Sequence, residues 1–496
     1  MKQITYVSTR GGGEEVTASR AILNGIAADG GLYVPTELPK PNWDFDVLKE
    51  MDYRELAYTV IKEFLTDYTE EELRACINAA YDKKFDTPEI APLVKSGDFR
   101  YLELYHGATA AFKDMALSLL PHLLVTAAKK NRIKEKIVIL TATSGDTGKA
   151  ALAGFADVPG TGIVVFYPKY GVSKIQERQM VTQTGKNVCV AGITGNFDDA
   201  QTGVKKIFTD PAMLEKLKKN GYRFSSANSI NIGRLVPQVA YYVWAYCRLL
   251  KEGSIKKGEE INFAVPTGNF GNILAGFYAK QLGLPVHKFI CASNDNRVLT
   301  DFFETGEYNK NRKFILTESP SMDILVSSNL ERLIYHIAGG DAARNAELMK
   351  DLSNKGAYTI TDVMKLGLSD FWAGAASTEE MRGAINSVFK AGHYCMDTHT
   401  GVACAVAEKY VEETGDPHVC VVVSTASPYK FTASVLKAIG EDAEDDDAFA
   451  LADRLEKIIG VKQPATVTTA RKSPVLHDTV CETEDMPKVV EHFLGL

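Results

Sequence analysis

Short apolar runs alternate with longer segments of helical spacing along most of the chain. Each run is rich in β-branched and aromatic residues, as strands are, and each is followed by a segment whose apolar residues recur at helical intervals. Runs of this kind occupy residues 136–143, 162–168, 187–193, 261–266, 286–293 and 418–427. Because strands that alternate with helices usually form parallel sheets, the pattern predicts a parallel sheet covered by helices.

Two regions depart from this alternation. Residues 1 to about 95 contain short strand-like runs and turns, followed by helical periodicity at 55–65 and 70–81. The segment from about 300 to 400 is more helical, and the acidic stretch EDAEDDD follows residue 438. Because acidic residues favour the N-terminus of a helix, we interpret this stretch as a solvated helix start.

The composition is typical of a globular protein that binds a small ligand. With 496 residues, of which 45% are hydrophobic and 24% charged, the chain is long enough for two or three packed domains. The formal net charge of -7 supplies no basic surface for nucleic acid or for an anionic membrane, so neither is expected as a partner. We expect a small-molecule ligand instead.

The N-terminus and the cysteines indicate the cellular compartment. The first residues, MKQITYVSTRGGGEEV, lack the basic and then apolar pattern of a secretory signal, and no apolar run approaches the roughly 20 residues that cross a bilayer. We therefore expect a cytosolic protein. The eight cysteines show no CxxC pair and no His/Cys ligand spacing, which favours reduced, mostly buried thiols over disulfides or zinc. No metal site is predicted.

Two glycine-rich loops follow predicted strands. In TATSGDTGKAALAGFA the loop spans residues 144–148, in AVPTGNFGNILAGFYAK it spans 268–272, and a helical pattern follows each. Backbone N–H groups at a helix N-terminus can bind an anion, and glycine lets the anion approach closely. The first loop fails the P-loop pattern and the second lacks G-x-G-x-x-G. Either loop could be a simple turn, but the two together favour two anion sites.

One lysine stands among small and apolar residues. The stretch YHGATAAFKDMALSLLP places Lys113 beside Phe112 and among alanines, with Asp114 directly after it. A buried amine loses hydration and deprotonates more easily, which suits a nucleophile, whereas a surface lysine paired with Asp114 is the alternative. An amine in an apolar pocket, two anion sites and the hydroxyl-rich strand end STAS, residues 424–427, are the parts needed to hold pyridoxal phosphate.

Several motifs resemble those of the threonine synthase family. HGATAAFKD is similar to its lysine motif HGPTxAFKD, with Ala108 where proline is usual. TSGDTGKAA, GVSKIQERQM, SANSINIGR, PTGNFGN and DTHTGVA look like its other signatures and occur in the same order, and GLYVP at residues 31–35 fits as well. The resemblance covers about residues 1–440. It is closest to the longer form of the enzyme, which belongs to fold type II of the pyridoxal phosphate-dependent enzymes.

The resemblance implies a role for each matching residue. Lys113 would form the Schiff base with pyridoxal 5'-phosphate, and Thr425 would contact the pyridine nitrogen. The cofactor phosphate would lie on the backbone amides of one loop, formed by Gly268, Asn269, Phe270, Gly271 and Asn272. The substrate α-carboxylate would bind at the other loop, to Ser144, Asp146 and Thr147.

The substrate of this family is O-phospho-L-homoserine, whose phosphate needs charge-assisted hydrogen-bond donors. By resemblance the candidates are Ser173, Lys174, Arg178, Asn228, Ser229, Asn231 and Arg234. Ser173 could instead cap a helix, and Lys174 and Arg178 could belong to a solvated helix face. His399 in MDTHTGVA could line the site or cap the helix that follows.

The resemblance also predicts the fold and the activity. We expect an α/β protein of the tryptophan synthase β-like type with two open twisted sheets. Its parts would be an N-terminal accessory domain at 1–95, a large cofactor domain at 96–134 and 225–496, and a small parallel α/β domain at 135–224 that closes over the substrate. The expected reaction converts O-phospho-L-homoserine and water to L-threonine and phosphate by β,γ-elimination and β-addition, the last step of threonine biosynthesis, in a monomer or homodimer.

Two other functions stay open at this point. A serine or threonine dehydratase of the same fold is favoured if Arg178 and Arg234 lie far from the cofactor. A non-catalytic anion-binding relative would lack the lysine or a complete glycine-rich loop, and this chain has both.

Overall fold

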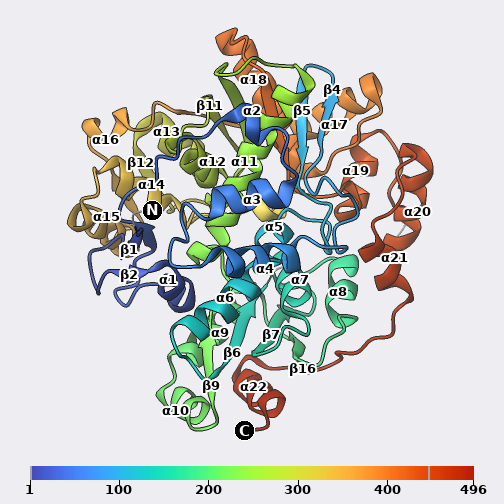
Figure 1. Cartoon of the computed structure of the whole chain (residues 1–496). Coiled ribbons are helices and arrows are strands. Elements are labelled where there is room, and N and C mark those ends of the chain that lie inside the picture. Colours follow the sequence, from blue (N-terminus) through green and yellow to red (C-terminus); the bar gives the residue numbers. More distant parts are fainter. Residues whose placement is uncertain (1–2, 144, 445–446) are drawn as a thin grey trace.

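The computed structural model describes residues 3–143, 145–444 and 447–496. Within them, the chain forms two helix-covered sheets. The larger sheet lies in the upper half of Figure 1 and the smaller sheet in the lower half. Of the N-terminal helices, drawn in blue, α3 (Tyr53–Ile61) and α4 (Glu70–Ala80) lie near the middle of the view (Figure 1). The sequence predicts both sheets.

The larger sheet has the strand order β14-β11-β10-β15-β5-β4. All neighbouring strands are parallel except the edge strand β4, which is antiparallel to β5. Three of these strands, β10, β11 and β15, are the predicted apolar runs. The strand bounds are β4 (Leu93–Ser96), β5 (Phe99–Glu103), β10 (Ile261–Pro266), β11 (Val286–Ser293), β14 (Phe371–Ala375) and β15 (Cys420–Ser424).

Helices cover both faces of the larger sheet. Because side chains alternate across a strand, Val421 and Val423 of β15 pack into a core shared with α11 and α12, and Val422 packs into a core shared with α18. Burial on both faces explains why the strand reads as a continuous apolar run. The covering helices are α11 (Ile232–Glu252), α12 (Gly271–Gln281), α17 (Thr378–Gly392), α18 (Thr398–Thr414) and α19 (Thr432–Ala438).

The smaller sheet is parallel throughout, with the order β16-β8-β7-β6-β9. Its three central strands are the predicted runs that begin near residues 136, 162 and 187. The strands are β6 (Lys136–Ala142), β7 (Thr161–Pro168), β8 (Val188–Ile193), β9 (Tyr222–Ser225) and β16 (Val480–Cys481). The helices between them are α7 (Asp146–Phe155), α8 (Lys174–Val181), α9 (Phe197–Thr209) and α10 (Pro211–Lys219).

The C-terminal segment lies elsewhere than predicted. The sequence assigns residues 225–496 to the large domain, but β16 pairs with β8 of the smaller sheet. Helix α22 (Met486–Leu494) buries Met486 and Val490 in the core of that sheet, and α21 (Ala465–Lys472) contacts α8. A strand of two residues leaves no readable periodicity, so the sequence does not reveal this return of the chain. The other domain boundaries stay a prediction.

The N-terminal region is helical with one small antiparallel sheet, β2-β1-β3. Helix α3 packs on α11, while α1 and α4 pack on α6. A capping box between Thr69 and Glu72 starts α4, where helical periodicity begins in the sequence. The elements are β1 (Thr5–Ser8), β2 (Val16–Thr17), α1 (Ala18–Asn24), β3 (Tyr33–Pro35), α2 (Phe45–Leu48), α3 (Tyr53–Ile61), α4 (Glu70–Ala80) and α6 (Leu120–Lys130).

The region from 298 to 366 is largely helical, as predicted, with a short antiparallel pair of strands. After the acidic stretch, α20 (Ala448–Ile459) begins at Ala448, and the Asp447 carboxylate accepts from the Phe449 N–H. Residues 445–446 of that stretch lie outside the described residues. The elements are α13 (Val298–Thr305), β12 (Glu307–Asn309), η1 (Pro320–Met322), α14 (Leu330–Ile337), α15 (Ala342–Asn354), β13 (Ala357–Thr359) and α16 (Asp362–Leu366).

The structure also bears on membrane association and on the state of the thiols. In the part of the chain that the structure describes, no helix combines the length and the apolar character needed to cross a membrane. All eight cysteines are free thiols, and six of them are buried. Burial raises the pKa of the Cys247 thiol to about 12, which disfavours the reactive thiolate.

Candidate active site

Lys113 lies beside the carboxyl end of β15, at the start of helix α5 (Asp114–Leu117). Two backbone contacts hold its loop against the segment that follows β15. Ala111 forms a bridge with Ala426, and the Phe112 N–H donates to the Thr425 carbonyl at 2.7 Å. This pairing brings Lys113 and Thr425 to the same edge of the larger sheet, although they lie far apart in the sequence.

The Lys113 amine has surroundings that favour its neutral form. Burial lowers its pKa below the usual value; Asp146 opposes this shift, and the cations Arg234 and Lys430 add to it. Nζ lies 4.8 Å from the centre of the Phe112 ring, and none of the described residues forms a hydrogen bond or ion pair with it. A neutral, unpaired amine can act as a nucleophile or as a base.

Asp114 has a different partner from the one that the surface-lysine alternative requires. Its buried carboxylate accepts from the N–H and the hydroxyl of Thr109, at 2.8 and 2.7 Å. Burial raises the pKa of Asp114, and these two hydrogen bonds oppose the increase. Gly107 permits this close packing, because a Cβ there would lie 2.5 Å from the Asp114 Cβ. The carboxylate therefore holds the turn that precedes Lys113.

The loop before α12 presents five consecutive N–H groups. From Gly268 to Asn272, these groups donate to no acceptor among the described residues. The carbonyl groups are bound instead: that of Gly268 accepts from the Ser327 hydroxyl at 2.6 Å, and that of Asn269 accepts from the Asn329 side chain at 3.0 Å. The carbonyl groups thus have partners in the protein and the N–H groups do not. An anion from outside the chain can therefore bind to these N–H groups.

Asn272 and Phe270 support this interpretation of the loop. The Asn272 Oδ1 accepts from the hydroxyls of Tyr241 and Tyr242 at 2.6 and 2.8 Å, whereas its buried Nδ2 has no partner in the described part of the chain. Phe270 adopts a left-handed φ of 63°, which lets the loop turn sharply into the helix. An unpaired buried donor costs stability unless an acceptor binds it, so the loop fits a phosphate group.

The loop before α7 leaves two further N–H groups available. The Thr143 hydroxyl accepts from the N–H of Gly145 at 3.0 Å, and Gly145 has a φ of 141°, which only glycine adopts readily. The N–H groups of Asp146 and Thr147 donate to no acceptor that the structure describes. A carboxylate can therefore bind at this helix N-terminus. Ser144, the third predicted residue of this loop, lies outside the described residues.

A buried lysine that the sequence analysis misses binds Asp146. The Lys430 Nζ lies 2.8 Å from the Asp146 Oδ1, and it donates to the Thr109 carbonyl at 3.2 Å and to the Gln179 side chain at 3.3 Å. Burial raises the pKa of Asp146, but Lys430 and Lys113 lower it, and the net pKa falls well below its usual range. The ion pair connects the segment after β15 to the N-terminus of α7.

The sequence does contain a signal for Lys430. SPYKF places this lysine among apolar residues directly after STAS, which is the pattern that identifies Lys113. The partner Asp146 lies in the loop before α7, more than 280 residues earlier in the chain, and no local pattern links the two. Recognition of the pair would have required knowing that the two loops meet.

Arg234 is buried and incompletely paired. It is 4% exposed, its Nη1 donates to the Ala227 carbonyl at 3.1 Å, and its Nε has no partner among the described residues. Burial lowers the pKa of Arg234 to about 10, so the guanidinium still carries its charge at neutral pH. Helix α11, which carries Arg234, packs on α5, whose N-cap is Lys113, and the Arg234 charge contributes to the lowered pKa of that lysine. A buried cation with a free donor suits an anionic ligand.

Two of the other predicted phosphate ligands are bound to the protein. The Arg178 guanidinium donates to the carbonyls of Ala470 and Ser473 at 2.9 and 2.6 Å, so it holds the C-terminal segment. Asn231 caps α11, and its Nδ2 donates to the Ile22 carbonyl at 3.0 Å. Both side chains therefore have a structural task, and their contact with substrate stays a prediction.

Three further candidates, Ser173, Lys174 and Asn228, lie at exposed positions, and Ser229 is half-buried. Ser173 caps α8 in a capping box with Gln176, which agrees with its alternative interpretation. Lys174 is exposed at the first position of the same helix. Asn228 is exposed, with its Oδ1 at 3.5 Å from the Thr141 hydroxyl. Their role in binding substrate stays a prediction.

His399 is buried and holds a neighbouring turn in place. Its Nδ1 lies 2.7 Å from the Asp397 Oδ2, and its Nε2 accepts from the Ser321 N–H at 3.0 Å. The backbone donor at Nε2 assigns the proton to Nδ1. Ser321 packs against the anion-binding loop, since a Cβ on Gly268 would lie 2.5 Å from the Ser321 carbonyl. Helix α18 is capped by Asp397, so the capping role considered for His399 belongs to its neighbour.

An amine at the carboxyl ends of parallel strands, next to a loop of free N–H groups, meets the requirements of a fold-type-II pyridoxal phosphate-dependent enzyme. In agreement, the family model for pyridoxal-phosphate dependent enzymes matches residues 91–426. The models for the threonine synthase N terminus and for the threonine synthase C-terminal region match residues 5–81 and 400–491. The chain belongs to the threonine synthase family, whose cofactor is pyridoxal phosphate.

Relatives in several organisms agree with this assignment. Threonine synthase of Schizosaccharomyces pombe is 35% identical, in a match that covers 88% of this chain and 90% of that protein. Threonine synthase-like 1 of Macaca fascicularis is 40% identical over 85% of this chain, but the match covers 58% of that longer protein. The chain thus spans about three fifths of the length of the threonine synthase-like 1 relatives.

Solved structures have the same fold over nearly the whole chain. A pyridoxal phosphate-bound threonine synthase of Brucella melitensis is 35% identical with a TM-score of 0.88, and the match covers 99% of this chain and 98% of that one. A yeast threonine synthase is 30% identical with a TM-score of 0.89, and the match covers 99% of each chain. The predicted family, fold type and cofactor are confirmed.

Proposed function

We propose that this chain converts O-phospho-L-homoserine and water to L-threonine and phosphate, as a pyridoxal phosphate-dependent carbon–oxygen lyase. The observation that supports the proposal is the buried, incompletely paired Arg234 on α11, the helix that packs on α5 directly after Lys113, in addition to the two anion-binding loops. A cofactor phosphate and a substrate carboxylate would occupy the two loops, and Arg234 offers a third anion site. A dehydratase substrate carries no second anion for it to bind.

The residues around Lys113 fit the cofactor. We assign the N–H groups of 268–272 to its phosphate, the Lys113 amine to its aldehyde and the Thr425 hydroxyl to its pyridine nitrogen. When bound, pyridoxal phosphate supplies an electron sink that acidifies the protons on Cα and Cβ of an attached amino acid. A hydroxyl at Thr425, unlike a carboxylate, would leave the ring nitrogen largely unprotonated. The ring would then withdraw electrons less strongly.

Lys113 then has a second task as a base. Its lowered pKa means that the amine is neutral in a larger fraction of molecules, so it can remove the Cα proton and return a proton later. The N–H groups of Asp146 and Thr147 orient the substrate carboxylate, which fixes the direction of the Cα–H bond. Arg234 binds the substrate phosphate and stabilises its negative charge as the bond to Cγ breaks.

The smaller sheet carries the substrate-binding loop of α7, while the larger sheet carries the amine. We propose that substrate binding draws the two together, which would exclude water until it is needed at Cβ. Similar cofactor positions and no domain movement in substrate-soaked and empty crystals would count against this closure. The cytosol as location and a monomeric or homodimeric state stay part of the proposal.

A product assay tests the proposed reaction. The purified protein, loaded with pyridoxal phosphate, should release one phosphate for each threonine formed from O-phospho-L-homoserine, and its cofactor spectrum should change when that substrate is added. Formation of a 2-oxo acid from serine or threonine, without phosphate release from O-phospho-L-homoserine, would instead identify a dehydratase.

Arg234→Gln should weaken binding of the phosphorylated substrate. Loss of one charge-assisted hydrogen bond, worth about 1.5–3 kcal/mol, predicts a KM about 10- to 100-fold higher. Steady-state kinetics with O-phospho-L-homoserine measure this, and inorganic phosphate as a competitive inhibitor should weaken in parallel. Arg178→Gln is the contrasting variant: we expect it to lower thermal stability and leave KM near the wild-type value. The reverse pattern would move the phosphate site to Arg178.

A further inference from the structure

A second group of titratable side chains lies at the opposite edge of the larger sheet. Glu260 directly precedes β10, His287 is the second residue of β11, and His418 comes two residues before β15. These are the amino ends of three neighbouring parallel strands, whereas the candidate active site lies at their carboxyl ends. The group is therefore separate from the site described above, and its three residues come from distant parts of the sequence.

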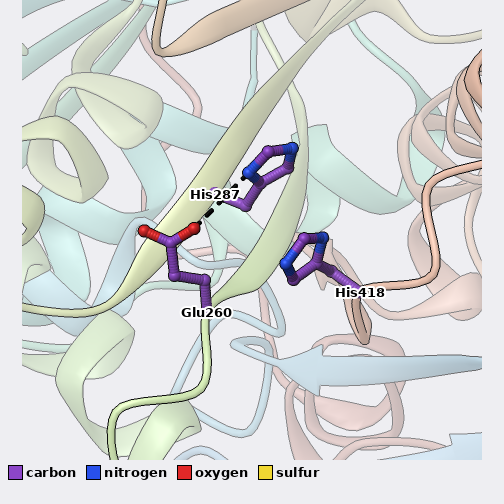
Figure 2. Close-up of side chains that lie close together, drawn as sticks. All are labelled: Glu260, His287 and His418. Carbon is purple, nitrogen blue, oxygen red and sulfur yellow. Dashed lines mark ion pairs between the residues drawn. The ribbon is translucent and has the colours of Figure 1, made fainter.

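The three side chains face one another around a shared space, as Figure 2 shows. One potential ligand atom from each lies within 4.8 Å of the other two. The His287 Nδ1 is 3.5 Å from the Glu260 Oε2, and the two imidazole rings are stacked with their centres 4.3 Å apart. Glu260 is exposed and both histidines are half-buried, so an ion can reach them from solvent.

A buried carboxylate lies behind both rings. The Asp416 side chain is 5% exposed; its Oδ1 binds the His418 Nδ1, and its Oδ2 is 3.5 Å from the His287 Nε2. Asn262 and Tyr410 donate to the same carboxylate and hold it in place. With Nδ1 bound to Asp416, His418 can offer only Nε2 as a ligand, and His287 can offer Nδ1 on the side of Glu260.

His418 has the hydrogen-bonding pattern that metal-binding histidines show in proteins, and His287 has the same carboxylate at 3.5 Å. One ring nitrogen faces the ion, and the other donates to a carboxylate that fixes the orientation of the ring. We propose that Glu260, His287 and His418 bind a divalent transition-metal ion, for which zinc fits best. Two imidazoles and one carboxylate with a water molecule form a common four-coordinate zinc set, whereas magnesium and calcium prefer oxygen ligands alone.

Binding would need the three side chains to rearrange. Ligand atoms at about 2.0–2.2 Å from zinc lie roughly 3.3 Å from one another in a tetrahedral site. An imidazole coordinates an ion in the plane of its ring, so the two rings, now stacked with their planes 17° apart, would have to rotate until their nitrogens point to one ion. The exposed Glu260 side chain would turn toward the same ion. A bound ion would connect the amino ends of β10, β11 and the segment before β15, so it stabilises the folded chain independently of the proposed reaction.

Zinc titration of the full-length, pyridoxal phosphate-loaded protein tests the site. After removal of any affinity tag and treatment with a chelator, isothermal titration should detect one zinc ion per chain. We expect His287→Ala and His418→Ala each to weaken zinc binding by about 100-fold, and Glu260→Gln by about 10-fold. The thermal unfolding midpoint should rise with zinc for the wild type and stay unchanged for the His287→Ala/His418→Ala double variant.

His492→Ala is the matched control, because it removes an exposed imidazole from α22, far along the chain from the site. It should bind zinc like the wild type. Circular dichroism without zinc verifies that each variant is folded, and the exposed position of Glu260 makes Glu260→Gln informative even if a histidine variant unfolds. Absence of zinc binding to the wild type, or undiminished binding in folded Glu260→Gln and His418→Ala, would overturn the proposal.

Discussion

Lys113→Ala is expected to abolish both the covalent attachment of pyridoxal phosphate and the reaction. The amine is the only group assigned to the cofactor aldehyde, and it also acts as the base at Cα. Loss of such a group predicts turnover about 10⁴-fold below the wild type, which corresponds to about 5.4 kcal/mol of transition-state stabilisation. Phosphate release measures the turnover, and the yellow absorbance of the purified protein reports the attachment.

Borohydride reduction and peptide mapping identify the attached lysine directly. Lys149 is the alternative attachment site for the cofactor, because burial lowers its pKa to about 8. Its Nζ donates to the Gln183 side chain at 2.5 Å. Lys437→Ala is the matched control, since it removes an exposed lysine from α19 and should keep absorbance and turnover. If the labelled peptide contains Lys149 or Lys430 instead of Lys113, the assignment of the site is wrong.

Lys430→Met should destabilise the fold and impair substrate binding together. It removes the cation that faces the buried Asp146 carboxylate at 2.8 Å and keeps an apolar side chain of similar length. An uncompensated buried charge costs about 3–5 kcal/mol, which chemical denaturation would measure as a lower free energy of unfolding. Because Asp146 contributes an N–H group to the proposed carboxylate site, KM for O-phospho-L-homoserine should rise as well.

A double-mutant cycle separates the ion pair from a general packing defect. Asp146→Asn alone leaves the Lys430 amine without its acid, whereas Lys430→Met/Asp146→Asn removes both charges. We expect the double variant to lose less stability than the sum of the single variants, by about 1–3 kcal/mol. Additive losses would show that the two side chains do not stabilise each other, and that the proximity of the two loops has another cause.

The sequence predicts the elements whose pattern is local. β6, β7, β8, β10, β11 and β15 are apolar runs because helices bury both of their faces, so each can be read without knowing its neighbours. β9 and β14 are not predicted, because several of their residues are partly exposed and neither strand is a continuous apolar run. β16 has two residues and gains its stability from pairing with β8, so no pattern within the segment can reveal it.

The same distinction applies to the candidate site. Lys113 and the loops 144–148 and 268–272 each have an unusual local composition, and the structure brings Lys113 and Thr425 to one edge of the sheet. The Lys430–Asp146 pair depends on contact between distant segments. The sequence around the two arginines does not distinguish them. The structure does: the buried Nε of Arg234 has no partner among the described residues, whereas Arg178 binds two carbonyls.

The return of the C-terminus to the smaller sheet also has a mechanical consequence. The polypeptide crosses between the two sheets three times: after α6, after β9, and through α21, which packs on α8. Two connections alone would permit rotation about the line that joins them, but a third, fastened by Arg178 and by the Leu476 N–H on Val181, acts as a tether. Any movement of the α7 loop toward Lys113 must keep the length of that tether. The tether therefore limits how far, and in which direction, the smaller sheet can move relative to the larger one.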